Sequence, residues 1–436
     1  MKRREFLTTG ALAAGGALLS SRVSFAGTAN GNKPRLVFVI LRGALDGLAA
    51  VPACGDPGYA RLRGELAMGR PGTDGGALPL DGFFALHPSL SFMQQSYAAR
   101  ELIVFHAVAS PYRDRSHFDG QNVLETGYPQ PHAVATGWLN RALATVPAAR
   151  APEKERGISI APTAPLVMRG PAAVTSWSPS HLAPLDDDTL HRIADLYSRD
   201  PELGQKLAEA LAAESIADEG MSGAAASGSM TGSQDAAPDP TMSADAMPGR
   251  RNAERPLLAK RGKPGAQYAE VVKAAARFLR EEDGPQVAVF DTTGWDTHFN
   301  EGSAKGQLAV RLAVLDAALS DLKTGLGPTW NDTAVLLATE FGRTVAENGT
   351  RGTDHGTATA AYLLGGAVKG GRVVTDWPGL SPRGLYQDRD LRPTLDLRAV
   401  MKGVLAEHLA VPEGELESSV FPASSQARPL RDLMRA

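Results

Sequence analysis

Apolar residues form short continuous runs along this chain, and most of these runs lie next to glycine, threonine or a charged residue. Continuous apolar runs of this length are typical of strands that are buried on both faces of a parallel sheet, whereas strands with one exposed face alternate apolar and polar positions. The pattern therefore predicts five buried strands, at 36–41, 102–108, 287–290, 334–338 and 360–364.

Between these runs, the apolar residues recur with the spacing of amphipathic helices. This periodicity predicts helices at 88–100, 116–125, 137–146, 190–211, 266–282, 303–324 and 395–409. Alternating strands and helices are typical of an α/β fold with a mainly parallel sheet. We expect three layers, in which helices cover both faces of a central sheet.

One long stretch interrupts the pattern. From Ala217 to Arg250 there is no Leu, Ile, Val or aromatic residue. Such a composition cannot bury enough apolar surface to offset the entropy of ordering, so we expect disorder over 214–263. Strands of one expected sheet lie on both sides of this stretch. We therefore interpret it as an insertion in a single domain, 34–436, rather than as a linker between two domains.

The first residues have the features of an export signal. Arg3 and Arg4 precede a mild apolar run, 11–19, and Ser24 and Ala26 place small residues at a cleavage site. A twin arginine in this context is typical of a Tat signal. The run is too short to cross ~30 Å of hydrocarbon, and no later segment is apolar enough. We predict a signal at 1–26, cleavage after Ala26, a periplasmic or secreted protein, and the Tat translocation machinery as a partner.

Composition excludes several classes of function. The chain has 45 basic and 48 acidic residues and a net charge of -3, so we expect no nucleic-acid partner. Its single cysteine, Cys54, excludes an intrachain disulfide and any cysteine-rich metal site. The motifs of serine esterases, phosphate-loop enzymes, dinucleotide-binding folds and zincins are absent.

Carboxylates and imidazoles follow four of the predicted strands and precede the fifth. In open α/β sheets, ligands bind beyond the carboxyl ends of the strands. The candidate metal ligands are Asp46, Asp296, His298, Glu340, Asp354 and His355, and the candidate catalytic residues are Ser116, His117 and Arg343. Mixed oxygen and imidazole ligands suit one or two divalent ions such as Zn, Mn, Mg or Ca.

Three of these residues have a structural alternative. Ser116 is expected to begin a helix, so it can serve as an N-cap or as a nucleophile placed over the helix N-terminus. His117 can be a metal or substrate ligand, or it can pack beneath the loop. Arg343 can hold an oxyanion through two parallel hydrogen bonds, or it can form an ordinary loop ion pair.

The combination of motifs resembles the exported family of unknown function numbered 1501. The resemblance rests on the Tat signal and on five segments: 41–47, 116–118, 295–298, 340–343 and 353–356. That family is similar to the alkaline phosphatase/sulfatase/phosphoglycerate mutase superfamily. The resemblance therefore implies an alkaline phosphatase-like fold with two divalent metals at the carboxyl edge of the sheet.

The resemblance also implies roles for individual residues. Ser116 stands where the superfamily nucleophile begins its helix, and Asp46 matches a ligand of the second metal. The remaining matches are metal ligands: Asp296, His298, Glu340 and His355. The sequence departs from the pattern where Glu340 replaces an aspartate and Phe341 replaces the histidine beside it.

These observations predict a metal-dependent hydrolase that acts on a small anionic phosphate or sulfate ester. The alternative is a non-catalytic periplasmic binding or assembly protein on a degenerate form of the same fold. The missing histidine at Phe341 favours the alternative, and the retained carboxylates and histidines favour the enzyme.

Overall fold

The computed structural model describes residues 33–146, 156–179 and 264–435. It contains all five predicted strands, with small changes at their ends: β1 (Arg35–Arg42), β4 (Leu102–Ala109), β7 (Val287–Thr293), β8 (Thr333–Ala338) and β9 (Thr359–Leu364). The predicted signal at 1–26, the helix at 190–211 and the insertion at 214–263 lie outside the described residues.

The strands form one large sheet with the order β10-β4-β9-β8-β1-β7-β5-β6. β13 pairs with the carboxyl end of β4. The four short strands that the apolar runs did not predict are β5 (Gly157–Ile160), β6 (Val174–Trp177), β10 (Arg372–Val374) and β13 (Leu395–Asp396). All pairings are parallel except those of β9, which runs antiparallel to both β4 and β8. The sheet is thus mainly parallel, as predicted.

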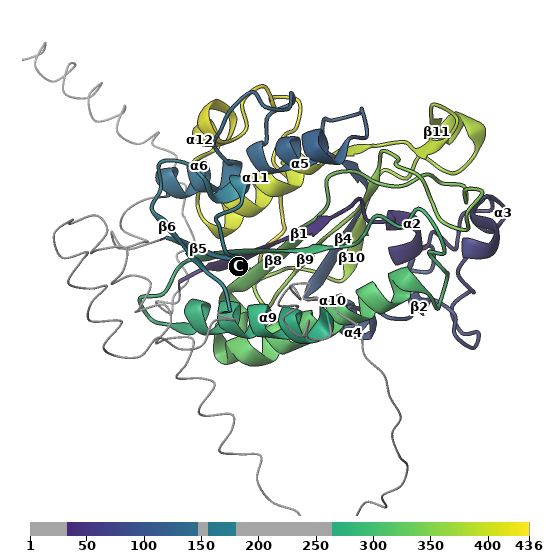
Figure 1. Cartoon of the computed structure of the whole chain (residues 1–436), viewed down its shortest axis with the longest axis horizontal. Coiled ribbons are helices and arrows are strands. Elements are labelled where there is room, and N and C mark those ends of the chain that lie inside the picture. Colours follow the sequence, from purple (N-terminus) through teal and green to yellow (C-terminus); the bar gives the residue numbers. More distant parts are fainter. Residues whose placement is uncertain (1–32, 147–155, 180–263, 436) are drawn as a thin grey trace, which may run out of the picture. The chain divides into compact units, whose positions relative to one another are not determined.

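Helices cover both faces of the sheet (Figure 1). One face carries α5 (His117–Thr126), α6 (Trp138–Thr145) and α11 (Leu397–His408). The other carries α4 (Ser91–Ala98), α9 (Pro264–Arg280) and α10 (Gln307–Leu326). These helices match predicted ones with shifted ends. The prediction of a three-layer α/β architecture is confirmed.

The core is divided by the sheet into two parts, and β1 contributes to both. Val37, Val39 and Leu41 pack with apolar residues of α9 and α10, whereas the intervening residues pack with α6 and α11. Side chains of β1 from Leu36 to Leu41 are fully buried. Because successive side chains of a strand point to opposite faces, a continuous apolar run fits a central strand between two helical layers.

Small elements complete the described chain: α2 (Gly47–Ala50), α3 (Tyr59–Arg63), β2 (Leu78–Pro79), β3 (Ala85–Leu86), β11 (Leu385–Tyr386), β12 (Asp390–Leu391) and α12 (Glu413–Glu415). No helix in this part of the chain has the length and apolar character needed to cross a membrane.

The direction of β9 decides where the candidate site lies. Since β9 is antiparallel to its neighbours, its amino end lies at the same edge of the sheet as the carboxyl ends of β4 and β8. The loop that enters β9 therefore meets the loops that leave the parallel strands. This edge brings several of the predicted site residues together.

Candidate metal centre

Three side chains from separate loops converge at this edge. His117 is the first residue of α5, Asp296 follows β7, and His355 precedes β9. One ligand atom from each lies within 4.8 Å of the other two. Among the residues that the structure describes, this is the group of His, Cys, Asp and Glu side chains with the geometry to hold a metal ion.

His298 adds a fourth donor to this group. Its Nε2 lies 3.1 Å from Oδ1 of Asp296 and 3.0 Å from Nε2 of His355. The side chains of all four residues are between 26% and 40% exposed, so solvent and small molecules can reach the group. We call these four residues, His117, Asp296, His298 and His355, the metal centre.

The other ring nitrogen of each histidine is held by an oxygen acceptor. Nδ1 of His117 lies 2.8 Å from Oε1 of Glu340, and Nδ1 of His355 lies 2.8 Å from the carbonyl oxygen of Arg115. Nδ1 of His298 lies 3.2 Å from Oδ1 of Asp354. An ionised carboxylate or a carbonyl oxygen only accepts, so each Nδ1 is the donor. In a neutral imidazole the lone pair is then on Nε2, the atom that faces Asp296.

The spacing of these atoms fits a divalent ion. Nε2 of His117 is buried without a hydrogen-bond partner among the described residues, and it lies 3.4 Å from Oδ2 of Asp296. Zinc binds imidazole nitrogen and carboxylate oxygen at about 2.0–2.1 Å with tetrahedral geometry, which places the ligand atoms about 3.3 Å apart. Four contacts within this group, between 3.0 and 3.4 Å, are close to this separation.

Glu340 lies behind His117 instead of facing the centre. The sequence predicted it as a metal ligand, but its fully buried Oε1 accepts from His117, from the backbone N–H of Gly43 and from Gln121. Thr339 donates to its other oxygen. Burial alone would raise the pKa of Glu340, but these hydrogen bonds hold it below its usual value. Glu340 is therefore an ionised anchor for His117. Its hydrogen bond raises the pKa of His117.

Arg343 lies beneath Asp296. Its fully buried guanidinium donates to Oδ1 of Asp296, and to both the side-chain and the backbone oxygen of Thr353. Burial raises and Arg343 lowers the pKa of Asp296, with a net shift downward. Of the two readings that the sequence left open for Arg343, this geometry supports the ion pair. Its donors are used to orient Asp296, so we do not assign it to an oxyanion.

Phe341 packs against the imidazoles of the centre. Its ring stacks on His117 at 5.0 Å between centroids and lies 5.2 Å from the ring of His355. The residue is buried, with 3% of its surface exposed. Where the superfamily pattern expects a metal-ligating histidine, this chain has an apolar wall.

Ser116 occupies the N-cap position of α5, directly before His117. Its hydroxyl makes no capping hydrogen bond to the helix, and its backbone N–H donates to the hydroxyl of Tyr112. The side chain is partly exposed. The hydroxyl of Ser116 therefore does not act as a hydrogen-bonding N-cap.

Asp46 is not part of the metal centre. Its Oδ1 accepts from the backbone N–H of Ala49 at the start of α2, and its Oδ2 accepts from Arg63 at 2.8 Å. Arg63 is fully buried on α3 and also lies 3.7 Å from Oε1 of Glu301. The second metal site that the resemblance implied at Asp46 is thus occupied by a guanidinium. Asp354 is a partner of His298, since its Oδ1 accepts from that ring and from Asn348.

Sequence reasoning missed Arg63, Glu301 and Asn348. Glu301 follows His298 by three residues, and this position was its only signal. It is fully buried, and its Oε2 accepts from Thr297 and from Thr353, the residue that also holds Arg343. Burial, together with the charge of Asp46, raises the pKa of Glu301 to about 8. Arg63 and Asn348 carried no signal, because each looks like an ordinary polar residue of a surface helix or loop.

The part of the chain that holds the metal centre also matches a known protein family. The model of a family of proteins of unknown function, DUF1501, matches residues 96–418. The chain belongs to this family. All four residues of the metal centre lie within the DUF1501 match, whereas Asp46 and Arg63 precede it.

Two solved structures are similar to this chain at low sequence identity. One is the crystal structure of Ps i-CgsB in complex with k-i-k-neocarrahexaose, with a TM-score of 0.39 and 11% identity; the match covers 91% of this chain and 77% of that one. The other is a phosphonate monoester hydrolase of Agrobacterium radiobacter, with a TM-score of 0.34 and 12% identity; the match covers 78% and 70%. No curated protein matched the sequence. The assignment to DUF1501 rests on the family model.

Proposed function

We propose that this DUF1501 protein is an exported, metal-dependent hydrolase of phosphate or sulfate esters. One observation carries the proposal: His117, Asp296 and His355 offer ligand atoms within 4.8 Å of one another, and Nε2 of His298 lies 3.0 Å from Nε2 of His355. Two imidazole nitrogens and a carboxylate at this distance repel one another unless a proton or a metal ion lies between them. A bound divalent ion would take the place of the shared proton.

The side chains around the centre have distinct roles in this proposal. His117, His298, His355 and Asp296 would hold the ion, while Glu340, Asp354 and the carbonyl of Arg115 fix the rings and Arg343 fixes the carboxylate. Hydrogen-bond acceptors behind metal-bound histidines set the tautomer and the orientation of their rings. When bound, the ion would supply positive charge to the ester oxygens as negative charge develops on them.

Ser116 would be the nucleophile. Its hydroxyl oxygen would form a bond to the phosphorus or sulfur atom while the bond to the leaving-group oxygen breaks, and the hydroxyl proton would be transferred to that leaving group. Water would then cleave the enzyme ester and restore the serine. Two observations support this assignment: Ser116 adjoins His117, and its hydroxyl is not used as a helix cap.

The first experiment measures the metal. Protein that has been purified without chelator is analysed for bound metal, together with the variants His117→Ala and His355→Ala. We expect one divalent ion per chain, lost in both variants. The control is His132→Ala, because the side chain of His132 is 65% exposed and its ring hydrogen-bonds Asp119, outside the metal centre, while its contact with Asn122 is made by the backbone N–H. Metal content unchanged by His117→Ala would contradict the metal centre.

The second experiment measures turnover. We expect the protein with its metal to hydrolyse an aryl phosphate or an aryl sulfate, and Ser116→Ala to reduce kcat by at least about a thousandfold while retaining the metal. If Ser116→Ala retains full turnover, the serine is not the nucleophile.

Phe341 favours a second candidate function. An apolar ring stacked on His117 and His355 stands where a further ligand is expected, so the centre can be one that binds an anion without cleaving it. The protein would then be a non-catalytic binding or assembly protein. Metal binding with saturable uptake of an aryl phosphate, but no product over hours, would select this candidate.

We also propose export through the Tat pathway with cleavage after Ala26, on the basis of the Arg3-Arg4 pair and the apolar run that follows. Mass spectrometry of the protein from a periplasmic fraction should find an N-terminus at Gly27. Replacing both arginines by lysine should leave the uncleaved protein in the cytoplasm. Export that persists in this variant would overturn the assignment.

A further inference from the structure

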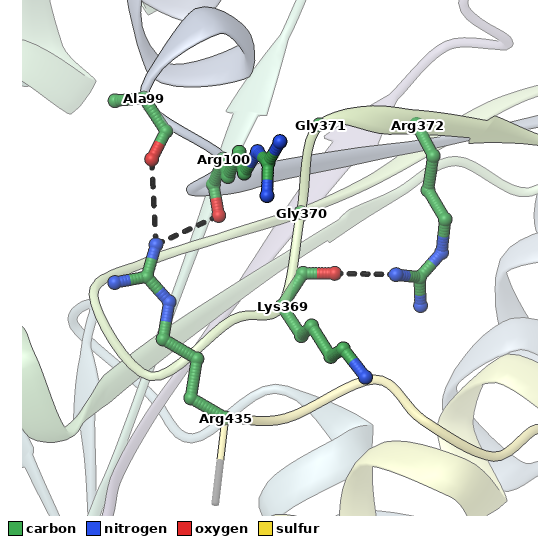
Figure 2. Close-up of a pocket in the computed structure, with 7 residues that line it drawn as sticks. All are labelled: Ala99, Arg100, Lys369, Gly370, Gly371, Arg372 and Arg435. Carbon is green, nitrogen blue, oxygen red and sulfur yellow. Dashed lines mark hydrogen bonds between the residues drawn. The ribbon is translucent and has the colours of Figure 1, made fainter.

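A basic pocket lies at the edge of the sheet opposite the metal centre. It has a volume of about 590 Å³ and is lined by Ala99, Arg100, Lys369, Gly370, Gly371, Arg372 and Arg435 (Figure 2). The backbone N–H groups of Gly370 and Gly371 donate to the carbonyls of Arg100 and Leu102, at the amino end of β4. β10 begins next to it and runs parallel to β4. The metal centre lies at the carboxyl ends of the parallel strands, so the two sites are separate.

The pocket has a strong positive charge. Four of its seven lining residues are basic. Among the described residues, Lys369 forms an ion pair with the carboxylate of Asp432, and the charge of Arg372 also acts on that carboxylate. The guanidinium groups of Arg100, Arg372 and Arg435 have no ion pair with a described carboxylate. Four positive charges and one negative leave a local charge of three. Unneutralised cations around one cavity are typical of an anion site.

Backbone carbonyls hold two of these guanidinium groups in place. Figure 2 shows one terminal nitrogen of Arg435 donating to the carbonyls of Ala99 and Arg100, and Arg372 donating to that of Lys369. Nε of Arg435 also donates to the carbonyl of Val368, and Arg372 to that of Asp432. A guanidinium has five N–H donors, so each arginine keeps donors for a ligand. Arginine side chains that are already fixed lose little entropy when they bind an anion.

Two glycines allow this arrangement. A Cβ on Gly370 would lie 2.4 Å from the backbone nitrogen of Leu102, so only glycine permits the loop to approach β4 this closely. Gly371 has a φ of +84°, and a Cβ there would lie 2.9 Å from Cγ of Arg100. The stem of Arg100 therefore rests against glycine at the rim of the pocket. The glycines that let the loop approach β4 thus also leave room for Arg100 beside the other basic residues of the pocket.

We propose that this pocket binds an anion with at least two phosphate groups, either a free oligophosphate or a phosphorylated headgroup. Planar guanidinium groups bind phosphate oxygens through paired hydrogen bonds. A single phosphate would leave part of the charge of three cations uncompensated, whereas two linked phosphates match it. The volume lies within the range of small-ligand sites, about 300–1,000 Å³. This proposal is independent of the proposed hydrolase function.

Calorimetric titration of the full chain with inorganic pyrophosphate tests the proposal. Pyrophosphate can also bind a metal, so the titration is done on His117→Ala, in which the metal centre is disabled. We expect saturable binding that weakens with salt, as ionic contacts do. Arg100→Gln should weaken it by about tenfold, which corresponds to about 1.4 kcal/mol. The control is Lys273→Gln, which removes one exposed positive charge from α9, far from the pocket.

Each outcome has a defined meaning. Arg100 makes no side-chain hydrogen bond to any described residue, so Arg100→Gln should melt at the wild-type temperature. Lys369→Gln is a second variant with the same expected weakening of binding. Vesicles of phosphatidylcholine with and without phosphatidylinositol phosphate distinguish a headgroup from a free oligophosphate. Binding of either probe that is weakened by about tenfold in both variants supports the site. Binding unchanged in both variants, or no binding of either probe, overturns it.

Discussion

The orientation of His117 depends on one buried carboxylate. Oε1 of Glu340 accepts from His117, Gly43 and Gln121, and Oε2 accepts from Thr339, so both oxygens face only donors. A glutamine in this place would direct its NH₂ group at one of these donors. The ring of His117 would then lose its anchor, and a buried donor would lose its acceptor.

We therefore predict that Glu340→Gln weakens metal binding by about 10–100-fold and lowers the free energy of unfolding by about 1–3 kcal/mol. Competition titration with a metal indicator measures the first effect, and urea unfolding of the metal-free protein measures the second. Glu347→Gln is the control, because that carboxylate accepts only from the backbone of Glu65 near the surface. Equal metal affinity in the two variants would show that Glu340 does not position His117.

A second prediction at this scale concerns Gly47, the first residue of α2. A Cβ there would lie 2.5 Å from the backbone nitrogen of Ala360 and 2.8 Å from the backbone of Thr359. Backbone atoms of a central strand cannot move aside as a flexible side chain can. Gly47→Ala should lower the free energy of unfolding by about 1–3 kcal/mol or more.

Gly414, in α12, provides a matched control. A Cβ there meets nothing within 4 Å. Gly414→Ala should therefore be neutral or should stabilise the protein by up to about 1 kcal/mol, because alanine reduces the entropy of the unfolded chain. Denaturant unfolding of the two variants gives the comparison. Equal effects of the two substitutions would contradict the close contact between α2 and β9.

At the scale of elements, α4 receives its N-terminal cap from another helix. Leu90 occupies the N-cap position and has no side-chain acceptor, but the carboxylate of Asp316 on α10 accepts from the N–H groups of Phe92 and Met93 at 2.8 and 3.0 Å. The hydroxyl of Ser91 also donates to it. Asp316 thus satisfies amides that the helix itself cannot, and it joins α4 to α10.

We predict that Asp316→Ala lowers the free energy of unfolding by about 1–2 kcal/mol, the value of a strong N-cap. Asp321→Ala, an exposed aspartate on the same helix, should change stability by less than about 0.5 kcal/mol. Urea unfolding measures both, and hydrogen exchange at Phe92 and Met93 should increase only in Asp316→Ala. Unchanged exchange there would show that the cap does not hold α4.

The sequence predicted the long central strands because each contains a continuous apolar run, 36–41 in β1 and 334–338 in β8. It did not predict β6 or β10, whose residues are only partly buried and whose runs are three or four residues long. Nor can periodicity give the direction of a strand. The apolar sequence of β9 is similar to those of its neighbours β4 and β8, and its antiparallel direction is seen only in its hydrogen bonds to them.

For the site, the sequence indicated which residues carry chemistry but not how they are arranged. Asp296, His298 and His355 lie at the predicted edge, and His117 joins them as a fourth member. The carboxylates of Asp46 and Glu340 were predicted as ligands from their position after strands. Their actual partners, Arg63 and His117, come from distant parts of the chain, and only the packed structure brings them within hydrogen-bonding distance.

At the scale of the whole molecule, a chain of buried polar contacts runs from α2 to the metal centre. Asp46 pairs with Arg63, which also faces Glu301. Glu301 accepts from Thr353, and Thr353 accepts from Arg343, the partner of Asp296. In this series of contacts, two carboxylates, those of Asp46 and Glu301, share the guanidinium of Arg63. Only one of them can be ionised without an uncompensated buried charge, so the other keeps its proton.

Glu301 is the group that keeps it, since its pKa is raised to about 8 while that of Asp46 is lowered. In the unfolded chain Glu301 releases its proton near pH 4.5. Between these values the folded state holds a proton that the unfolded state has lost, so the contribution of Glu301 to stability falls as pH rises. It is complete below about pH 4.5 and is lost by about pH 8.

Glu301→Gln imitates the protonated side chain at every pH, because its NH₂ group can donate to Asp46 as the carboxyl proton does. We predict that the free energy of unfolding of the wild type, relative to Glu301→Gln, decreases between about pH 5 and pH 8 by at least about 1.4 kcal/mol, the equivalent of one pKa unit. Titrations that the two proteins share, including that of His117, cancel in this difference, and Asp46 titrates below the window. Urea unfolding at several pH values measures it on metal-free protein. If the free energy of unfolding of the two proteins changes in parallel with pH, Glu301 is already ionised in the folded state. No proton would then be shared between Glu301 and Asp46.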